Sequence, residues 1–286
     1  MIPDAMIVFF LLGFLVSVLI GLTGMGGGAL TTPILILLGI PATVAVGSDL
    51  AFTSVTRALG SFLHGRRSNI DFGLVKLILL GSLPATIASY LLLPVLRAEL
   101  GISGLDSLLT ELLAALLVLA SVIGISRTLL QRRSYRETKE NDVLSVQSAN
   151  SGVLVGQDSP TQSVILSSRD RAFIVAAGAF VGFAVQMTSV GSGTILIFLL
   201  MFLFKNKKMV GTDIFHAFIL TSLGAFLHFG LGNVDLAMVA ALVAGGIPGI
   251  FLGVRLLSFV SLPRLRSILN VVIMGAGLTL ILHLLA

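Results

Sequence analysis

A glycine-rich stretch near the N-terminus holds the residues best suited to bind an anion. Residues 21 to 33 read GLTGMGGGALTTP, with five glycines in the first eight positions. Glycines let backbone N–H groups converge, and a helix that starts near Ala29 adds its unpaired N–H groups and the positive end of its dipole. Such a corner favours an anion without a fixed charge. The candidate substrate-binding residues here are Thr23, Gly24, Gly26, Gly27 and Gly28.

A second loop of this kind, TSVGSGTI, occupies residues 188 to 195. Its hydroxyl groups add donors around the glycines, and the same composition precedes a short apolar segment in both halves of the chain, which favours a binding role. The alternative is that these small residues only allow close helix packing, as in the GxxxG pattern of residues 24 to 28. The candidate residues of the second loop are Thr188, Ser189, Gly191, Ser192, Gly193 and Thr194.

Arg57 lies in the middle of an expected helical segment. An unpaired charge inside a membrane costs at least about 2.5 kcal/mol, so we expect Arg57 to face protein or water. It either attracts an anionic substrate or forms a structural pair with a carboxylate or with backbone carbonyls. Its partner in the repeat described below is Thr221, so the charge is present in one half only.

Asp49, Asp213 and His216 are candidates for proton coupling. Each aspartate follows a hydroxyl residue near the expected start of a helix, so helix capping and proton or cation coupling both remain open. His216 lies one helical turn after Asp213, which makes a proton relay conceivable. Six other polar residues are expected to have structural roles, as turn and cap residues or at the membrane interface. The turn and cap residues are Asn69, Asp71, Asn233 and Asp235, and the interfacial ones are His64 and His228.

The composition indicates that helices in a lipid bilayer position these residues. The chain has 286 residues, of which 56% are hydrophobic and 11% charged, and its mean hydropathy is +1.08. Several apolar stretches are long enough to cross a hydrocarbon layer of about 30 Å as helices, and they lack the alternation of a β-barrel. We therefore expect an all-α integral membrane protein.

Several function classes are disfavoured. The absence of cysteine excludes disulfides, thiolate metal sites and cysteine nucleophiles. The chain contains no H-E-x-x-H, G-x-S-x-G or Walker-type motif, and its four histidines are scattered. We expect no enzymatic activity, no metal and no cofactor. The basic residues flank apolar segments, so the expected partners are the lipid bilayer and a small anionic substrate, not nucleic acid, and a homodimer is left open.

The sequence repeats itself with an offset of 164 residues. The stretch that begins VGSDLAF at residue 46 aligns with the stretch that begins VGTDIFH at residue 210. Residues 132 to 168 between the halves are rich in serine, glutamine and charge, which is typical of a linker. We therefore divide the chain into a first transmembrane repeat at residues 1 to 131, a cytoplasmic linker at 132 to 168, and a second transmembrane repeat at 169 to 286.

Each half is expected to contain five helical segments. The second segment of each half has roughly twelve residues, or about 18 Å of helix, which is too short for a simple crossing. It either crosses fully or forms a broken or re-entrant pair with its predecessor, with the glycine-rich loop at the tip. The expected segments are 5 to 22, 29 to 40, 48 to 64, 72 to 96 and 106 to 126, then 171 to 187, 194 to 204, 210 to 230, 236 to 258 and 267 to 285.

The basic residues predict the orientation of these segments. If the chain changes sides at every segment, all 18 lysines and arginines except Arg57 and Arg97 fall on one side. The positive-inside rule then places both termini outside and the linker in the cytoplasm of a multi-pass cell-membrane protein. Since five segments is an odd number, the second half is inverted relative to the first, as in many secondary transporters.

Four stretches, GLTGMGGGAL, VGSDLAF, VGTDIFHAFILTSLGAFLHFGLGNVD and GGIPGIFLGVRL, resemble the TauE/SafE sulfite-exporter family of membrane transporters. The resemblance covers about residues 5 to 131 and 170 to 285. It implies a secondary transporter that moves sulfite or organosulfonates such as sulfoacetate, usually outward and without its own ATPase. The family's glycine-rich loop corresponds to Gly24, Gly26, Gly27 and Gly28, and more loosely to Gly191, Ser192 and Gly193.

The residues alone support a broader statement, an anion-favouring carrier built from an inverted repeat. Alternating access around the paired glycine-rich loops is the expected mechanism. An anion channel and a transporter of another small organic anion remain alternatives. A membrane-embedded enzyme is less favoured.

Overall fold

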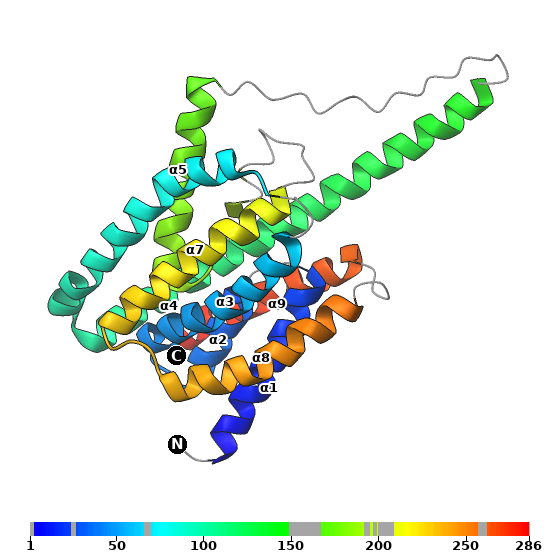
Figure 1. Cartoon of the computed structure of the whole chain (residues 1–286). Helices are drawn as coiled ribbons and strands as arrows, with labels where there is room; N and C mark the ends of the chain where they lie inside the picture. The colour runs from blue at the N-terminus through cyan, green and yellow to red at the C-terminus, as the bar shows by residue number, and fades with distance from the viewer. Residues whose placement is uncertain are drawn as a thin grey trace.

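The fold is taken from a computed structural model of the whole chain (Figure 1). Every regular element in the part that the structure describes is an α-helix. The prediction of an all-α protein is therefore confirmed. The described residues are 3–23, 27–65, 70–148, 167–191, 195–196, 199, 209–256 and 262–285.

The helices follow the predicted segments closely, with some ends shifted. One predicted segment, 194 to 204, lies mostly outside the described residues. The described helices are α1 (Pro3–Thr23), α2 (Gly28–Leu37), α3 (Ala42–Gly65), α4 (Phe72–Ser148), α5 (Ser168–Thr188), α7 (Met209–Gly230), α8 (Leu236–Leu256) and α9 (Leu262–Leu285).

α2 has only 10 residues, as the sequence predicts. At 1.5 Å per residue it is about 15 Å long, half the thickness of a hydrocarbon layer. Six stretches of the described chain are long and apolar enough to cross a membrane, and α3 is not among them because it carries more polar residues. The six are Ala5–Leu22, Phe72–Ser126, Ser168–Thr188, Gly211–Gly230, Leu236–Leu256 and Ser267–Leu285.

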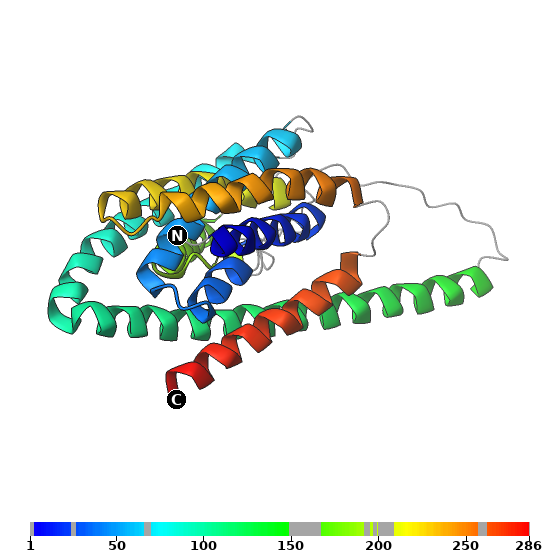
Figure 2. The ribbon, with the colours of Figure 1, turned by 90° about the horizontal axis from the view of Figure 1, so that it is seen from below.

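α4 consists of two helical arms that meet at Gly101. The backbone there has φ 72° and ψ −179°, a conformation that glycine adopts readily and other residues rarely do. The chain turns back on itself at this point (Figures 1 and 2). The second arm continues as helix to Ser148, so the first part of the predicted linker is helical. Residues 149–166 of the linker lie outside the described residues.

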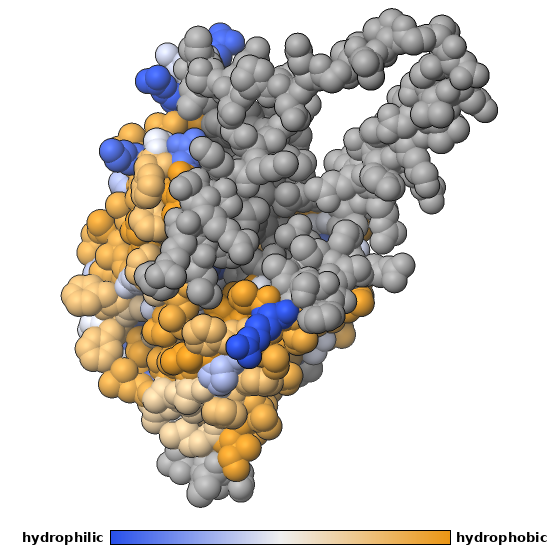
Figure 3. Space-filling view, turned by 45° about the vertical axis from the view of Figure 1, so that its right-hand side comes forward, coloured by the Kyte–Doolittle hydropathy of each residue, from blue (hydrophilic) through white to orange (hydrophobic). Residues whose placement is uncertain are grey.

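The outer surface of the bundle is apolar. On α1, for example, Ile7, Leu11 and Leu15 are exposed along one side, while Leu12 and Val16 are buried on the other. Hydrophobic residues cover most of the described surface in Figure 3. A face as apolar as the core is expected where lipid tails replace water, so the chain is a multi-pass membrane protein.

The two central helices, α3 and α7, are held together at both ends by matching hydrogen bonds. The N–H of Asp235, just after α7, donates to Ser48 Oγ near the start of α3 at 3.0 Å. The N–H of Asp71, just after α3, donates to Thr212 Oγ1 near the start of α7 at 2.9 Å. The start of each helix thus lies beside the end of the other, and α3 and α7 run antiparallel (Figure 1).

These residues are partners in the 164-residue repeat, since Ser48 aligns with Thr212 and Asp71 with Asp235. In each half, therefore, a hydroxyl near the start of the central helix accepts a hydrogen bond from a backbone N–H of the other half. An antiparallel pair of matching helices is what an inverted repeat requires. The orientation of the halves in a membrane stays a prediction.

Close helix packing repeats in the same way. A Cβ at Gly245 of α8 would collide with the carbonyl oxygen of Phe10 in α1, and a Cβ at Gly81 of α4 would collide with that of Val175 in α5. Gly81 aligns with Gly245 in the repeat, and Phe10 with Val175 when the offset is 165. Small residues thus allow the backbones of α1 and α8, and of α4 and α5, to touch.

The start of α1 and the end of α9 lie toward the same end of the bundle, and the end of α4 extends from the opposite end (Figures 1 and 2). The placement of both termini outside and of the linker in the cytoplasm stays a prediction.

The close contact at Gly245 gives a stability prediction. Gly245→Leu places a side chain against the backbone of α1, and we expect it to lower the free energy of unfolding by about 3 kcal/mol. Thermal unfolding of the purified protein in detergent measures this. Gly275→Leu is the matched control, because a Cβ at Gly275 meets no atom within 4 Å. Equal unfolding temperatures for the two variants would contradict the packing argument.

Candidate functional site

The two predicted loops meet in the described part of the chain. α2 begins at Gly28, and Gly27 occupies its N-cap position without a side-chain hydrogen bond. α5 ends at Thr188 and is followed by Ser189, whose φ of 60° is left-handed. A Cβ at Gly28 would collide with the carbonyl oxygen of Ser189 and would lie 2.8 Å from its hydroxyl oxygen. The N-terminus of α2 therefore packs directly on the end of α5.

The other predicted loop residues are placed in part. Thr188 is buried and its hydroxyl donates to the carbonyl of Ala184 at 2.8 Å, so it stabilises the end of α5. Gly191 is also buried, with φ 138°. Gly24, Gly26, Ser192, Gly193 and Thr194 lie outside the described residues, as does the side chain of Thr23.

Asp49 is fully buried in α3 and faces α2. Its Oδ2 accepts a hydrogen bond of 2.8 Å from the Thr32 hydroxyl, and its Oδ1 has no hydrogen-bond partner. Ser189 lies close enough to interact with the Asp49 carboxylate, yet the buried Ser189 hydroxyl also makes no hydrogen bond. The carboxylate thus stands beside the point where the two loops meet, with acceptor capacity left over.

The capping interpretation of Asp49 and Asp213 is wrong. α3 begins at Ala42 and α7 at Met209, and neither helix has an acidic residue in its first turn. The hydroxyl residues before the two aspartates also have other roles, because Ser48 and Thr212 accept the hydrogen bonds that join the halves. Asp71 and Asp235 do cap helices, since their carboxylates accept from the N–H groups of Leu74 and Met238 at 3.0 Å each.

Arg57 interacts electrostatically with both aspartates. It lies two turns after Asp49 on α3, it is only 7% exposed, and the carboxylates of Asp49 and Asp213 are its charged neighbours. Asp213 itself is 4% exposed. The expectation that Arg57 faces protein is therefore confirmed. The guanidinium joins a carboxylate from each half into one buried group of charges.

His216 is fully buried beside this group. Its Nε2 lies 2.9 Å from the hydroxyl of Ser82 in α4, and its Nδ1 has no hydrogen-bond partner. The repeat partners of His216 and Ser82 are Phe52 and Gly246, and there the Phe52 ring packs against the glycine. The same contact is thus polar in one half of the molecule and apolar in the other.

The sequence analysis did not predict the burial of two polar side chains, those of His228 and Gln186. His228 was expected at the membrane interface, but it is fully buried and its Nε2 lies 3.1 Å from the carbonyl oxygen of Gln186. Both side-chain amide atoms of Gln186 are buried without partners. The signal for Gln186 was its position, two residues before Thr188 in an otherwise apolar stretch. The predicted position of His64 cannot be compared, because its side chain lies outside the described residues.

The site is suited to binding and charge balance. Asp49 Oδ1 and the Ser189 hydroxyl, both buried without hydrogen-bond partners, lie beside the contact between the loops. Buried polar atoms without partners are uncommon unless a ligand or water satisfies them. In the described chain, no group of three or more histidine, aspartate or glutamate side chains lies close enough to hold a metal ion.

Comparisons with known proteins point to membrane transport. The family model of the sulfite exporter TauE/SafE matches residues 9–280. A curated relative, the probable membrane transporter protein YjnA of Bacillus subtilis (strain 168), is 33% identical over 276 residues, which cover 95% of this chain and 98% of the relative. No solved structure matches the chain.

The Ser82–His216 contact gives a prediction about stability. Ser82→Ala leaves a buried histidine nitrogen without its partner, and we expect the free energy of unfolding to fall by about 1 to 3 kcal/mol. Ser89→Ala is the control, because the hydroxyl of this buried serine on the same helix donates to its own backbone at Ala85. Thermal unfolding in detergent compares the variants, and a larger loss for Ser89→Ala would refute the interpretation.

Proposed function

Because this chain belongs to the sulfite exporter TauE/SafE family of membrane transporters, we propose that it is a secondary transporter that exports small sulfur-containing anions. Sulfite and organosulfonates such as sulfoacetate are the proposed substrates, and the cell membrane is the proposed location. The observation that carries the proposal is the contact between Gly28 and Ser189, which joins the two predicted anion-binding loops.

The surroundings of this contact suit an anion that must bind and leave. The N-terminus of α2 offers N–H groups and a positive dipole end, and Ser189 offers a buried hydroxyl that makes no hydrogen bond within the protein. Hydrogen bonds to a charged group are worth about 1.5 to 3 kcal/mol each. A few such donors bind an oxyanion without the permanent charge that would hold it too tightly.

Charge balance favours coupling to protons. With both carboxylates ionised, Asp49, Asp213 and Arg57 carry one net negative charge, which repels an anion. Binding of one proton makes the group neutral, and a second makes it positive. Because buried charge is costly in a membrane, an anion and a proton then enter the site more favourably together than separately. Asp49, Asp213 and His216 remain the proposed proton-coupling residues.

The arrangement of the halves supports alternating access. Each loop belongs to a different half, and α3 and α7 meet in antiparallel orientation with equal contacts at both ends. In transporters with inverted repeats, the site at the repeat interface opens to either side as one half rocks against the other. We propose that both termini lie outside and that the linker is cytoplasmic, because most basic residues fall on the linker side.

Removing one hydroxyl tests the proposed site. Ser189→Gly deletes the unpaired donor and suits the left-handed φ of 60°, so we expect normal thermal stability but a fall of about tenfold in labelled sulfite flux in proteoliposomes. Ser107→Ala, an exposed serine that bonds only within its own helix, is the control. Wild-type flux in Ser189→Gly would remove this loop from the mechanism.

Neutralising one carboxylate tests the coupling. In Asp213→Asn, Arg57 is balanced by Asp49 alone, so we expect substrate exchange to persist while a pH gradient no longer drives net sulfite flux. Asp235→Asn is the matched control, because asparagine can still cap α8. Proteoliposome assays with and without an imposed pH gradient measure both activities. Gradient-driven flux that survives in Asp213→Asn would rule out this residue as the coupling site.

A further inference from the structure

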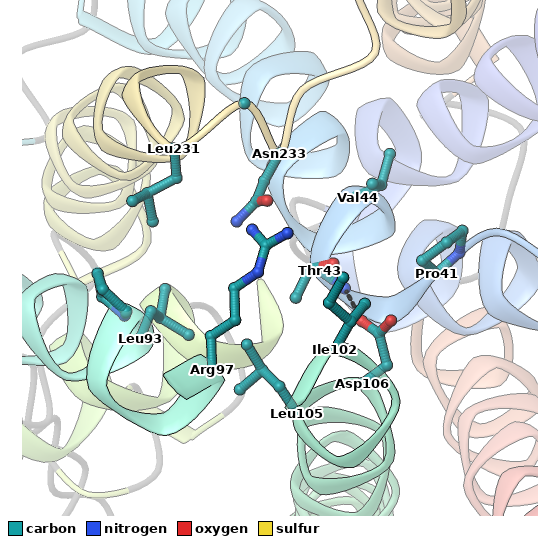
Figure 4. Close-up of a pocket in the computed structure, with 12 residues that line it drawn as sticks. Pro41, Thr43, Val44, Leu93, Arg97, Ile102, Leu105, Asp106, Leu231 and Asn233 are labelled. Atoms are coloured by element: carbon teal, nitrogen blue, oxygen red, sulfur yellow. Dashed lines mark hydrogen bonds between the residues drawn. The ribbon is translucent and has the colours of Figure 1, made fainter. Parts of the chain in front are cut away.

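A cavity of about 350 Å³ is lined by residues outside the two loops (Figure 4). The helices that line it meet at the end of the bundle where α1 starts and α9 ends (Figure 1). Three separate segments form it: the connection from α2 to α3, the reversal of α4 around Gly101, and the connection from α7 to α8. Its volume falls at the lower end of the range for small-molecule sites, about 300 to 1,000 Å³.

A cation points into this cavity. The guanidinium of Arg97 and the side-chain amide of Asn233 face one another across it (Figure 4). Asn233 is only 8% exposed, whereas Arg97 is exposed. In the part of the chain that the structure describes, neither side chain has a hydrogen bond or ion pair. Arg97 is also one of the two basic residues that the positive-inside pattern does not explain.

The one acidic residue among the described lining residues is Asp106, which already has a structural partner. Its Oδ1 accepts the backbone N–H of Thr43 at 2.9 Å, next to the start of α3. The rest of the lining is mostly apolar and includes Val44, Leu93 and Leu105. The cavity therefore combines one available guanidinium and one available amide with apolar walls, which is the usual composition of a site for a small organic ion.

The cavity adjoins the part of α3 that carries Asp49. A Cβ at Gly47 would collide with the carbonyl oxygen of Asn233, so the loop after α7 packs on α3 two residues before Asp49. The next contact along this loop is the hydrogen bond from the Asp235 N–H to Ser48 Oγ. Val44, which lines the cavity, and Asp49 are thus separated by about one turn of α3.

We propose that this cavity is a second binding site, for a small organic monoanion whose oxyanion group is held by Arg97 and Asn233 and whose apolar body lies against the walls. A guanidinium offers two parallel N–H donors that match a sulfonate or a carboxylate. We propose further that substrate anions bind here before they reach the site between the loops. This role rests on the proposed function, whereas the binding itself does not.

The test measures ligand binding to the full-length protein in detergent by thermal shift. Benzenesulfonate and benzoate are the probes, neutral benzenesulfonamide is the uncharged comparison, and sodium chloride keeps the ionic strength constant. We expect both anions, but not the sulfonamide, to raise the unfolding temperature of the wild type. Arg97→Gln should weaken the affinity for benzenesulfonate at least about tenfold, and Arg97→Lys should weaken it less. Arg169→Gln, which removes an exposed arginine at the start of α5, should bind as the wild type does.

Two results would overturn the second site: wild-type affinity in Arg97→Gln, or no stabilisation of the wild type by either anion. The unliganded unfolding temperature shows whether each variant is folded. Sulfite flux in proteoliposomes separates the two proposals. Absent flux in a wild type that binds benzenesulfonate through Arg97 refutes the proposed transport and leaves the site. Normal flux in a protein that binds neither anion refutes the site and leaves the transport.

Discussion

A polar group buried in a membrane bundle must find its hydrogen-bond partner inside the protein, because lipid offers none. This constraint explains the distribution of polar residues here. The outer helices present apolar side chains to their surroundings, while α3 and α7 carry the buried aspartates, the buried arginine and His216. Some buried polar atoms are satisfied within their own helix, as Thr53 and Thr221 are, and others by contacts between elements, such as Thr32 with Asp49 and Ser82 with His216. Among the unsatisfied atoms, Asp49 Oδ1 and the Ser189 hydroxyl lie beside the contact between the two loops.

The contacts that form the frame differ in kind from those of the site. α1 packs on α8, and α4 on α5, through backbone-to-backbone approaches at glycines, which leave little room for a different register. α3 and α7 are joined instead by hydrogen bonds at their ends, and between those ends they carry charged groups. Close backbone packing between the halves on the outside thus surrounds a polar interface between them in the interior.

The sequence predicted the helices well because hydropathy and the repeat are both strong signals in a membrane chain. It also predicted the approach of the two loops, since an inverted repeat brings matching segments together. Helix starts were less predictable: α3 begins at Ala42, and the N–H of Thr43 in its first turn donates to Asp106, a contact between distant residues. That error led to the capping interpretation of Asp49. The burial of His228 was missed because its partner is a backbone carbonyl of Gln186, which no pattern reveals.

The differences between the halves indicate where the chemistry has become specialised. A symmetric repeat would place the same contact on both sides, but the pair Phe52 and Gly246 replaces His216 and Ser82. Likewise Thr221, whose hydroxyl only bonds its own helix, occupies the position of Arg57. The aspartates are kept in both halves, whereas the cation and the histidine each occur once. Since the frame contacts are shared and these groups are not, the unmatched residues are what makes the proposed site different in the two halves.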